Sequence, residues 1–229
     1  MEKLVYLLRE TTETPGDALR DRLLSAAGTL RASGAVEIAI NVADEAVAAG
    51  KAVTIGRLDP PIRAMVSFWM DNSDDSDALE SALRGVVAAI AGYLVVESVP
   101  MINTTRVAAP GERTPGVNMV TCINRLPALS REEFWRIWYQ DHKRVAQETQ
   151  STFGYVRNTV VRPLTEGAPA CDGIVEEMFP IDALVDPKVW YAAGSDDELR
   201  ANLQRMMDSV QRFLDLGPLE SHPMSHYGL

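Results

Sequence analysis

The stretch VNMVTCINRLPALSREEFWRIWYQDHKRVAQE, residues 117–148, contains the two patterns that decide the fold. Residues 117–125 alternate between apolar and polar side chains, which predicts a strand. Ser130, followed three residues later by Glu133, matches a capping box, the reciprocal pairing of side chains and backbone that opens a helix. The helix is predicted to reach about Thr149.

The rest of this half continues the strand and helix pattern. We predict strands over 153–162 and 173–179, a helix capped by Ser195 with Glu198 and ending near Leu216, and a closing strand from Leu219. The order is therefore βαββαβ, the ferredoxin-like motif, in which both helices cover one face of a four-stranded sheet.

The first half of the chain repeats this order. The predicted elements are strands over 3–8, 36–42, 64–70 and 93–99, with helices over 18–31 and from the Asp77 and Glu80 capping box to Ala91. Between the halves, APGERTPG and its flanks have the composition of a linker. We therefore predict an α+β chain of two tandem ferredoxin-like domains, residues 1–107 and 117–229, joined by a linker over 108–116. Their bare sheet faces would pack sheet to sheet as a pseudo-dimeric α/β barrel.

Composition excludes several classes of protein. The 229 residues carry a net charge of -10, which repels nucleic acid and anionic membranes. The longest uncharged stretch, Gly85 to Val96, is too short to span a bilayer. Two cysteines cannot form a disulfide framework, so we expect a reduced, cytoplasmic protein without a nucleic-acid or membrane partner.

The helix from Ser130 to Glu148 holds the richest set of candidate residues. Trp135, Trp138 and His142 are spaced to share one helical stripe, which Tyr139 flanks. One interpretation is an aromatic pocket wall holding an imidazole for proton transfer near neutral pH. The alternative is a buried core stripe with a hydrogen-bonded histidine.

Strand 173–179 contains adjacent carboxylates, which must point to opposite faces of the sheet. If Glu176 is the inward one, burial would raise its pKa and make it an acid or a partner of His142. The alternative places both carboxylates near a solvated strand end. In strand 153–162, Tyr155 and Asn158 face opposite ways, and either face could line a ligand site.

The second half resembles the EthD domain family over roughly residues 117–229. The family pattern is matched by Phe134, Trp138 and His142; by Tyr155 and Asn158; by Asp172, Gly173 and Glu176; and by Asp208, Phe213 and Asp215. The resemblance implies the dimeric α/β-barrel group, which includes polyketide cyclases, lactone isomerases, cofactor-free monooxygenases and some haem enzymes. Some fungal relatives are dehydratases of hydroxylated aromatic polyketides.

The first half lacks the ionisable residues of that pattern. Alignment of the two halves puts Ala26 near the position of His142 and Ser67 near that of Glu176. We therefore expect a degenerate first half and at most one chemically equipped pocket.

No metal site is predicted, because the histidines and cysteines have no ligand spacing. His222 and His226 flank Pro223, and we assign them to a flexible C-terminal tail. A single imidazole would suffice to bind haem, which remains an alternative to the expectation of no cofactor.

The favoured function is a cofactor-independent lyase or isomerase, of dehydratase or cyclase type, acting on a small hydrophobic oxygenated cyclic or aromatic compound. His142 is the expected general acid or base, and Glu176 would tune it. Trp135, Trp138, Tyr139, Tyr155 and Asn158 are the expected substrate-binding residues. The first alternative is a non-catalytic accessory protein that binds a hydrophobic intermediate, and the second is a haem-binding or cofactor-free monooxygenase. One chain would supply its own pseudo-dimer, and its outer strand edges leave a homodimer open.

Overall fold

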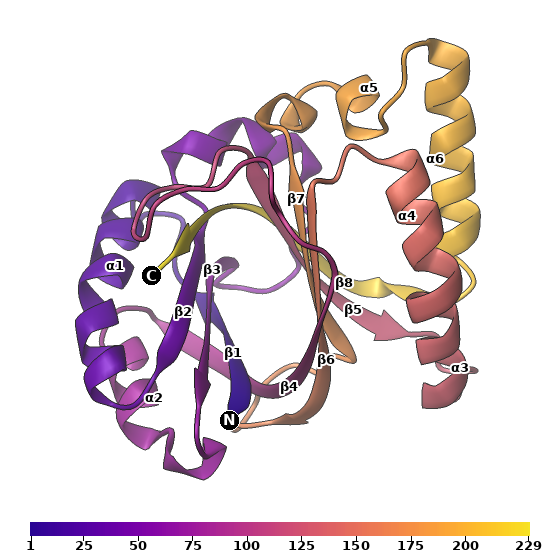
Figure 1. Ribbon diagram of the computed structural model, residues 1–229. Coiled ribbons are helices and arrows are strands. Elements are labelled where there is room, and N and C mark those ends of the chain that lie inside the picture. Colours follow the sequence, from indigo (N-terminus) through magenta and orange to yellow (C-terminus); the bar gives the residue numbers. More distant parts are fainter.

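Each half of the chain folds as βαββαβ in a computed structural model that describes all residues, 1–229 (Figure 1). The main elements of the first half are β1 (Glu2–Arg9), α1 (Gly16–Ala32), β2 (Val36–Val42), β3 (Ile62–Met70), α2 (Asp77–Arg84) and β4 (Ala89–Met101). Those of the second half are β5 (Val117–Arg125), α3 (Arg131–Arg136), α4 (Lys143–Thr149), β6 (Gly154–Pro163), β7 (Gly173–Phe179), α6 (Asp196–Val210) and β8 (Leu214–Gly228). Shorter helices are η1 (Glu45–Val53), η2 (Ser73–Asp75), η3 (Ile137–His142), η4 (Ile181–Leu184) and α5 (Pro187–Trp190).

The eight strands close into one antiparallel barrel in the order β1-β3-β2-β8-β5-β7-β6-β4. The two halves meet where β2 pairs with β8 and where β4 pairs with β6. The predicted pseudo-dimeric α/β barrel is therefore confirmed, and its two sheets also join edge to edge. Closure leaves no free strand edge in the barrel.

The barrel interior is filled by side chains from strands of both halves. Its apolar part is a cluster of 12 buried residues that includes Val5, Tyr93, Val120, Ile174 and Met224. No helix contributes to this cluster. The helices instead cover the outer faces, with α1 and α2 against one half and α3, α4 and α6 against the other (Figure 1).

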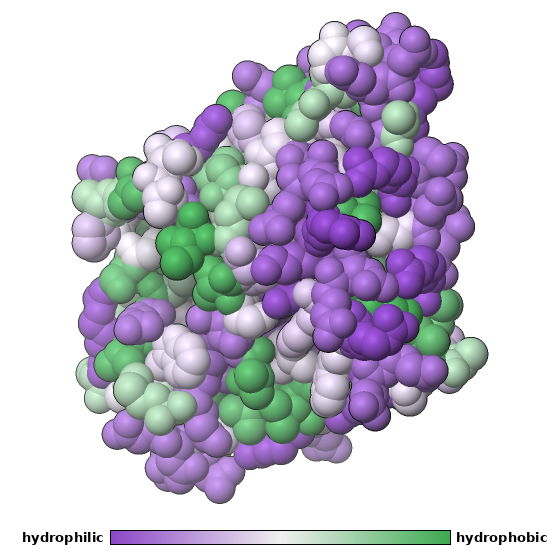
Figure 2. Space-filling model, turned by 45° about the vertical axis from the view of Figure 1, so that its right-hand side comes forward, coloured by the Kyte–Doolittle hydropathy of each residue, from purple (hydrophilic) through white to green (hydrophobic).

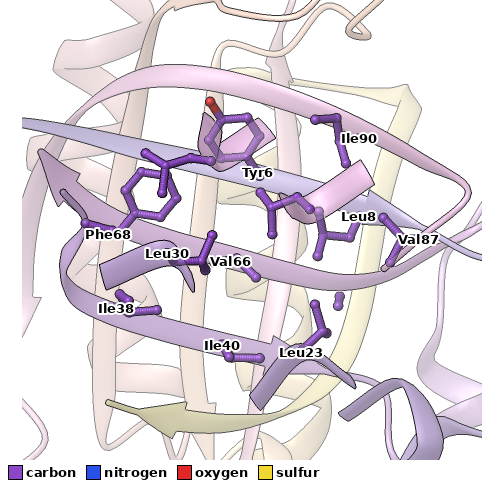
Figure 3. Close-up of a cluster of buried hydrophobic side chains, with 14 of the residues drawn as sticks. Tyr6, Leu8, Leu23, Leu30, Ile38, Ile40, Val66, Phe68, Val87 and Ile90 are labelled. Atoms are coloured by element: carbon purple, nitrogen blue, oxygen red, sulfur yellow. The ribbon is translucent and has the colours of Figure 1, made fainter. Parts of the chain in front are cut away.

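The layer under α1 and α2 is densely filled. Nineteen buried residues form one cluster, in which side chains from β1, β2 and β3 meet those of α1 and α2 (Figure 3). Tyr6 and Phe68 stack there with ring centroids 5.7 Å apart. Aliphatic and aromatic side chains therefore fill the space between this half's sheet and its helices.

The helix α2 is shorter than predicted, because it ends at Arg84 and β4 already begins at Ala89. The expected capping box does not form. Glu80 instead accepts a hydrogen bond from the Tyr6 hydroxyl at 3.1 Å and pairs with Arg84. The Glu80 side chain, which the capping box requires, is therefore bound to Tyr6, a residue distant in the sequence.

The C-terminal residues form an internal strand, as predicted from Leu219 onward, so the assignment of His222 and His226 to a flexible tail is wrong. The strand β8 begins at Leu214 and runs between β2 and β5, where Val120 stands opposite His222 and Asn41 opposite His226. The segment 108–116 also lies against β8, with Gly111 N–H donating to Gly228 O at 2.7 Å. The usual alternation of buried apolar and exposed polar residues is absent from β8, because several of its polar residues face the barrel interior.

None of the helices has the length and hydropathy that crossing a bilayer requires. Hydrophilic residues dominate the right-hand part of the surface in Figure 2, and the apolar residues form separate patches elsewhere on that face. The largest buried apolar cluster instead lies between the barrel and the helices of the first half.

Candidate functional site

A cavity of about 450 Å³ lies between the barrel and the helices of the second half. Its wall comes from β5, β6, β7 and α6, from the helix that carries His142, and from Ile55 and Arg57 of the first half. Most of its lining side chains are apolar, among them Phe213 and Met206. A mostly apolar cavity of this volume with few polar groups is the usual form of a small-molecule site.

The helix from Arg131 to Thr149 contains a π-helical turn, η3, at the residues that face this cavity. Its start is fixed as predicted, because Ser130 and Glu133 form the capping box. A π turn uses i→i+5 hydrogen bonds and is frequent at functional sites. It spans both Trp138 and His142, so both side chains reach the cavity from adjacent turns.

His142 is buried against the second long helix of this half. Its Nδ1 lies 2.9 Å from Ser209 Oγ on α6, and its ring centroid lies 4.9 Å from that of Phe213. Burial, assisted by the positive charge of Arg157, lowers the pKa of His142 to about 4. The imidazole is therefore neutral near pH 7, and Nε2 is the ring nitrogen without a protein partner.

Trp138 forms the floor of the cavity. It is 1% exposed, and its Nε1–H donates to the Tyr155 hydroxyl at 3.2 Å. The ring packs against Gly173, where an added Cβ would come within 2.6 Å of it. The glycine of the Asp172-Gly173 motif is thus required by the close approach of the indole to the sheet.

Glu177 is the carboxyl group that lines the cavity, and the prediction of its neighbour Glu176 for this position is wrong. The two point to opposite faces of β7, as strand alternation requires. Burial raises the pKa of Glu177 to about 7, so that its protonated and ionised forms coexist at neutral pH. Its partners across the sheet are Met119 on β5 and Tyr155 on β6.

Glu176 and Asn158 lie in the barrel interior, behind the sheet that separates them from His142. Glu176 accepts hydrogen bonds from the amide groups of Asn158, Asn41 and Asn118 at 3.0, 3.2 and 3.3 Å. The expected contact between Glu176 and His142 is therefore absent. Glu176 anchors a polar cluster that joins strands of both halves.

Trp135 and Tyr139 do not line the cavity either. Trp135 is 39% exposed, because the buried stripe runs through Phe134, Trp138 and His142 at four-residue spacing. Tyr139 contacts the side chain of Arg157, whose guanidinium carbon lies 3.9 Å from the ring centroid. Of the predicted binding residues, the structure brings Trp138 and Tyr155 together with His142.

Sequence reasoning missed Glu177, Ser209 and the wall supplied by the first half. The period of two in β7 separates Glu176 from Glu177, but it does not say which face the helices cover. Tyr155 could have identified the correct carboxylate. It stands opposite Glu177 on β7, and residues that stand opposite each other share one face of the sheet. The contribution of Arg57 follows from barrel closure and has no local signal.

Comparisons with known proteins find one family model and several solved structures that are similar to this chain. Residues 126–217 match the EthD domain model. Among solved structures, an anthrone oxidase-like protein aligns with 99% of this chain and 92% of its own, at 9% identity and a TM-score of 0.54. A putative chlorite dismutase aligns over 100% and 95% of the two chains, at 10% identity and a TM-score of 0.49. A variant of the chlorite dismutase of Candidatus Nitrospira defluvii aligns over 98% and 91%, at 10% identity and a TM-score of 0.48.

A search of curated proteins finds no sequence match to this chain. The family model covers the helix with His142, the strands β6 and β7, and α6, which together build most of the cavity wall. The likeness to the anthrone oxidase-like protein extends over both halves and supports the barrel as a whole. The second half of this chain therefore carries a match to the EthD domain over residues 126–217, within a closed eight-stranded barrel that a single chain completes.

Proposed function

We propose that the cavity binds a small hydrophobic, oxygenated cyclic or aromatic compound, and that the protein is a cofactor-independent lyase or isomerase of dehydratase or cyclase type. One observation carries this proposal. The single carboxyl group and the single imidazole that line the cavity, Glu177 and His142, face the same enclosed apolar space. Acid and base groups with oppositely shifted pKa values in one apolar site are the usual equipment for proton transfer.

The pKa values assign the two roles. Glu177, with a pKa of about 7, is matched to neutral pH as a general base. His142, with a pKa of about 4, stays neutral and suits hydrogen-bond donation. With Ser209 Oγ donating to Nδ1, the Nε2–H of His142 can donate to a substrate oxygen.

The reaction class follows from these roles. Glu177 removes a proton from a carbon that is next to a carbonyl group or conjugated with it through an aromatic ring, and the electron pair moves onto the carbonyl oxygen, where the His142 N–H stabilises it. Return of that proton to another carbon completes an isomerisation, while its delivery to a neighbouring hydroxyl group expels water and completes a dehydration. One positioned acid or base contributes about 10²–10⁴ in rate, which favours substrates whose carbon is already acidic.

Exchange of hydrogen for deuterium in D₂O tests the proton transfer without knowledge of the final product. Anthrone is the first probe, because it is a tricyclic ketone with acidic ring hydrogens and an anthrone oxidase-like protein shares the fold. We expect wild-type protein to accelerate the exchange, with a rate that rises with pH through about 7 as Glu177 ionises.

Glu177→Gln should lower the accelerated rate by about 10²-fold or more, and His142→Asn should lower it by a smaller factor. Trp135→Ala is the matched control, because this side chain is outside the cavity. An unchanged exchange rate in Glu177→Gln would contradict the proposal.

The second candidate is an accessory protein that binds a hydrophobic intermediate without changing it. The apolar lining of the cavity, in which 14 of 19 residues are hydrophobic, supports binding as directly as catalysis. Saturable binding of anthrone without accelerated exchange would favour this alternative.

A haem-dependent or cofactor-free monooxygenase is a further alternative. The residues fit haem in one respect: His142 would bind the iron through Nε2, while Ser209 holds the other ring nitrogen. They fit it less well in another, because Arg57 is the only lysine or arginine on the wall to pair with the two propionates. A Soret absorbance that forms on adding hemin and is lost in His142→Ala would favour haem, and oxygen uptake with anthrone would favour a monooxygenase.

A further inference from the structure

A second cavity, of about 570 Å³, lies where β8 meets the first half. It is lined by the start of α1, by η1, by residues 54–63 and by β8. The segment from Ile55 to Leu58 separates it from the first cavity. Ile55 and Arg57 face the cavity of His142, whereas Gly56 and Leu58 face the second one.

A buried pair of ionisable side chains adjoins this cavity. His222 lines the cavity, and its Nε2 lies 2.8 Å from Glu220 Oε2; the two residues are 4% and 5% exposed. Glu220 Oε1 accepts the backbone N–H of Arg57 at 2.6 Å, which fixes the carboxylate. An added Cβ on Gly56 would lie 3.2 Å from Cε1 of His222, so the loop backbone packs closely on the ring edge.

The pairing determines which nitrogen of His222 is available. Because the carboxylate of Glu220 accepts the Nε2–H, the proton is held at Nε2 and Nδ1 keeps its lone pair. Nδ1 has no partner in the protein. Burial lowers the pKa of His222, although Glu220 acts in the opposite direction. The ring is therefore neutral near pH 7, and Nδ1 is an acceptor. A ligand of this site must therefore present a donor, such as a hydroxyl group.

Positive groups lie in the same cavity. Gly50 of η1 packs against Pro223, and this contact brings Lys51, which has no ion-pair partner, beside the histidine strand. Gly16 also lines the cavity at the start of the 17-residue helix α1, where no side chain caps the helix. Free backbone N–H groups at a helix start favour an anion.

The carboxylates on the wall limit how much negative charge the cavity accepts. Asp44 is already bound, because it accepts hydrogen bonds from Ser225 at 2.6 Å and Tyr227 at 2.7 Å. Glu45 remains exposed at the rim. Lys51 and Arg63 balance the charges of Asp44 and Glu45 on the wall, and the Glu220 carboxylate behind His222 adds a further negative charge, which disfavours a dianion.

We propose that this second cavity is a binding site for a small monoanionic hydroxy acid, whose hydroxyl group donates to Nδ1 of His222 and whose carboxylate faces Lys51 and the start of α1. The apolar side chains of Val47, Leu58 and Ile62 on the wall accommodate a hydrophobic substituent. The site uses none of the residues assigned to proton transfer in the first cavity. Either site can therefore fail without the other.

Mandelate is the probe, because it combines a hydroxyl group, one carboxylate and a phenyl ring. We would follow the three histidine side chains by NMR during its addition to the full chain. The expected result is a saturable shift at His222, with His142 unchanged. Phenylacetate, which lacks the hydroxyl group, and 1-phenylethane-1,2-diol, which lacks the carboxylate, should each bind about tenfold more weakly or worse.

Lys51→Ala removes an exposed side chain, so the fold is expected to persist, and it should weaken mandelate binding about tenfold. Lys188→Ala removes an equal charge outside the cavity and should leave binding unchanged. Gly56→Ala should perturb His222 directly through the added Cβ. Equal binding of mandelate and phenylacetate would overturn the proposal, as would a shift confined to His142 or no shift at millimolar mandelate.

Discussion

The two helix layers of this barrel have the same topology, but one is filled by side chains and the other contains a cavity. In the first half, 19 buried residues fill the space between the sheet and its helices (Figure 3). In the second half, 8 buried residues form the corresponding cluster and a cavity of about 450 Å³ remains. One fold therefore encloses a packed core in one copy and leaves a cavity in the other.

One pair of equivalent positions shows how the difference arises. Ser67 stands opposite Val5 in the first half, and Glu176 stands opposite Val120 in the second, so β3 and β7 correspond in register. The next residue is Phe68 in β3 and Glu177 in β7. Where the first half inserts an aromatic ring into its core, the second half presents a carboxyl group to a cavity.

Truncation in the filled half should have the largest effect on stability. Phe68 is fully buried, and Phe68→Ala should lower the free energy of unfolding by about 3–5 kcal/mol, through lost burial and the cavity left behind. Met207→Ala is the matched change in the open half, where the side chain already borders empty space. Its cost should be less than half as large, and urea unfolding of both variants measures the difference. Equal losses would show that the two layers are packed alike.

The fit of Trp138 to the sheet can be tested at a single glycine. An alanine at Gly173 places a Cβ 2.6 Å from the indole, so Gly173→Ala should destabilise the protein by about 1–3 kcal/mol and displace Trp138 into the cavity. Gly28→Ala, on α1 with nothing within 4 Å of the new Cβ, is the control and should stabilise by about 0.4–1 kcal/mol. Thermal unfolding and tryptophan fluorescence report the two effects. The interpretation fails if Gly173→Ala is as stable as wild type.

The sequence was sufficient for the repeat, the barrel and the helix that carries His142, because each depends on local periodicity or on a capping motif such as Ser130 with Glu133. It was insufficient where a choice depends on the other half of the chain. Which of Glu176 and Glu177 meets the helices is decided by which sheet face closes the barrel. The closing strand was predicted from Leu219, but His222 and His226 were assigned to a flexible tail, because polar side chains that point into the barrel look like those of a solvated segment.

The opposite pKa shifts in the cavity predict opposite effects of pH on stability. His142, lowered to about 4, contributes stability that is present above its ordinary pKa of 6.5 and is lost as pH falls towards 4. Glu177, raised to about 7, contributes stability that is present below its ordinary pKa of 4.5 and is lost as pH rises through 7. In wild type the two slopes oppose each other between pH 4.5 and 6.5.

Replacing either residue should remove its own contribution to the pH dependence of the free energy of unfolding. Relative to wild type, Glu177→Gln should gain stability as pH rises towards 7, and His142→Asn should gain stability as pH falls towards 4, each by on the order of 1 kcal/mol. Urea unfolding at several pH values between 4 and 8 measures both. Differences that do not vary with pH would refute the shifted pKa values.

The smallest effect should come from Trp135, which the aromatic pattern singled out and the structure places outside the cavity. Trp135→Ala should change stability by no more than about 0.5 kcal/mol, as is usual for a surface substitution. Binding in the cavity should be unaffected. A loss of binding in this variant, measured by isothermal calorimetry, would return Trp135 to the site.

The central claim is that Glu177 keeps open, in the second half, a space that an aromatic ring fills in the first. The most direct measurement is the NMR shift of His142 on addition of anthrone to wild type and to Glu177→Phe, which places in β7 the residue found at the matching position of β3. The account predicts a saturable shift in wild type and none in the variant, which should remain folded and be at least as stable. A shift of equal size in both proteins, or in neither, would contradict it.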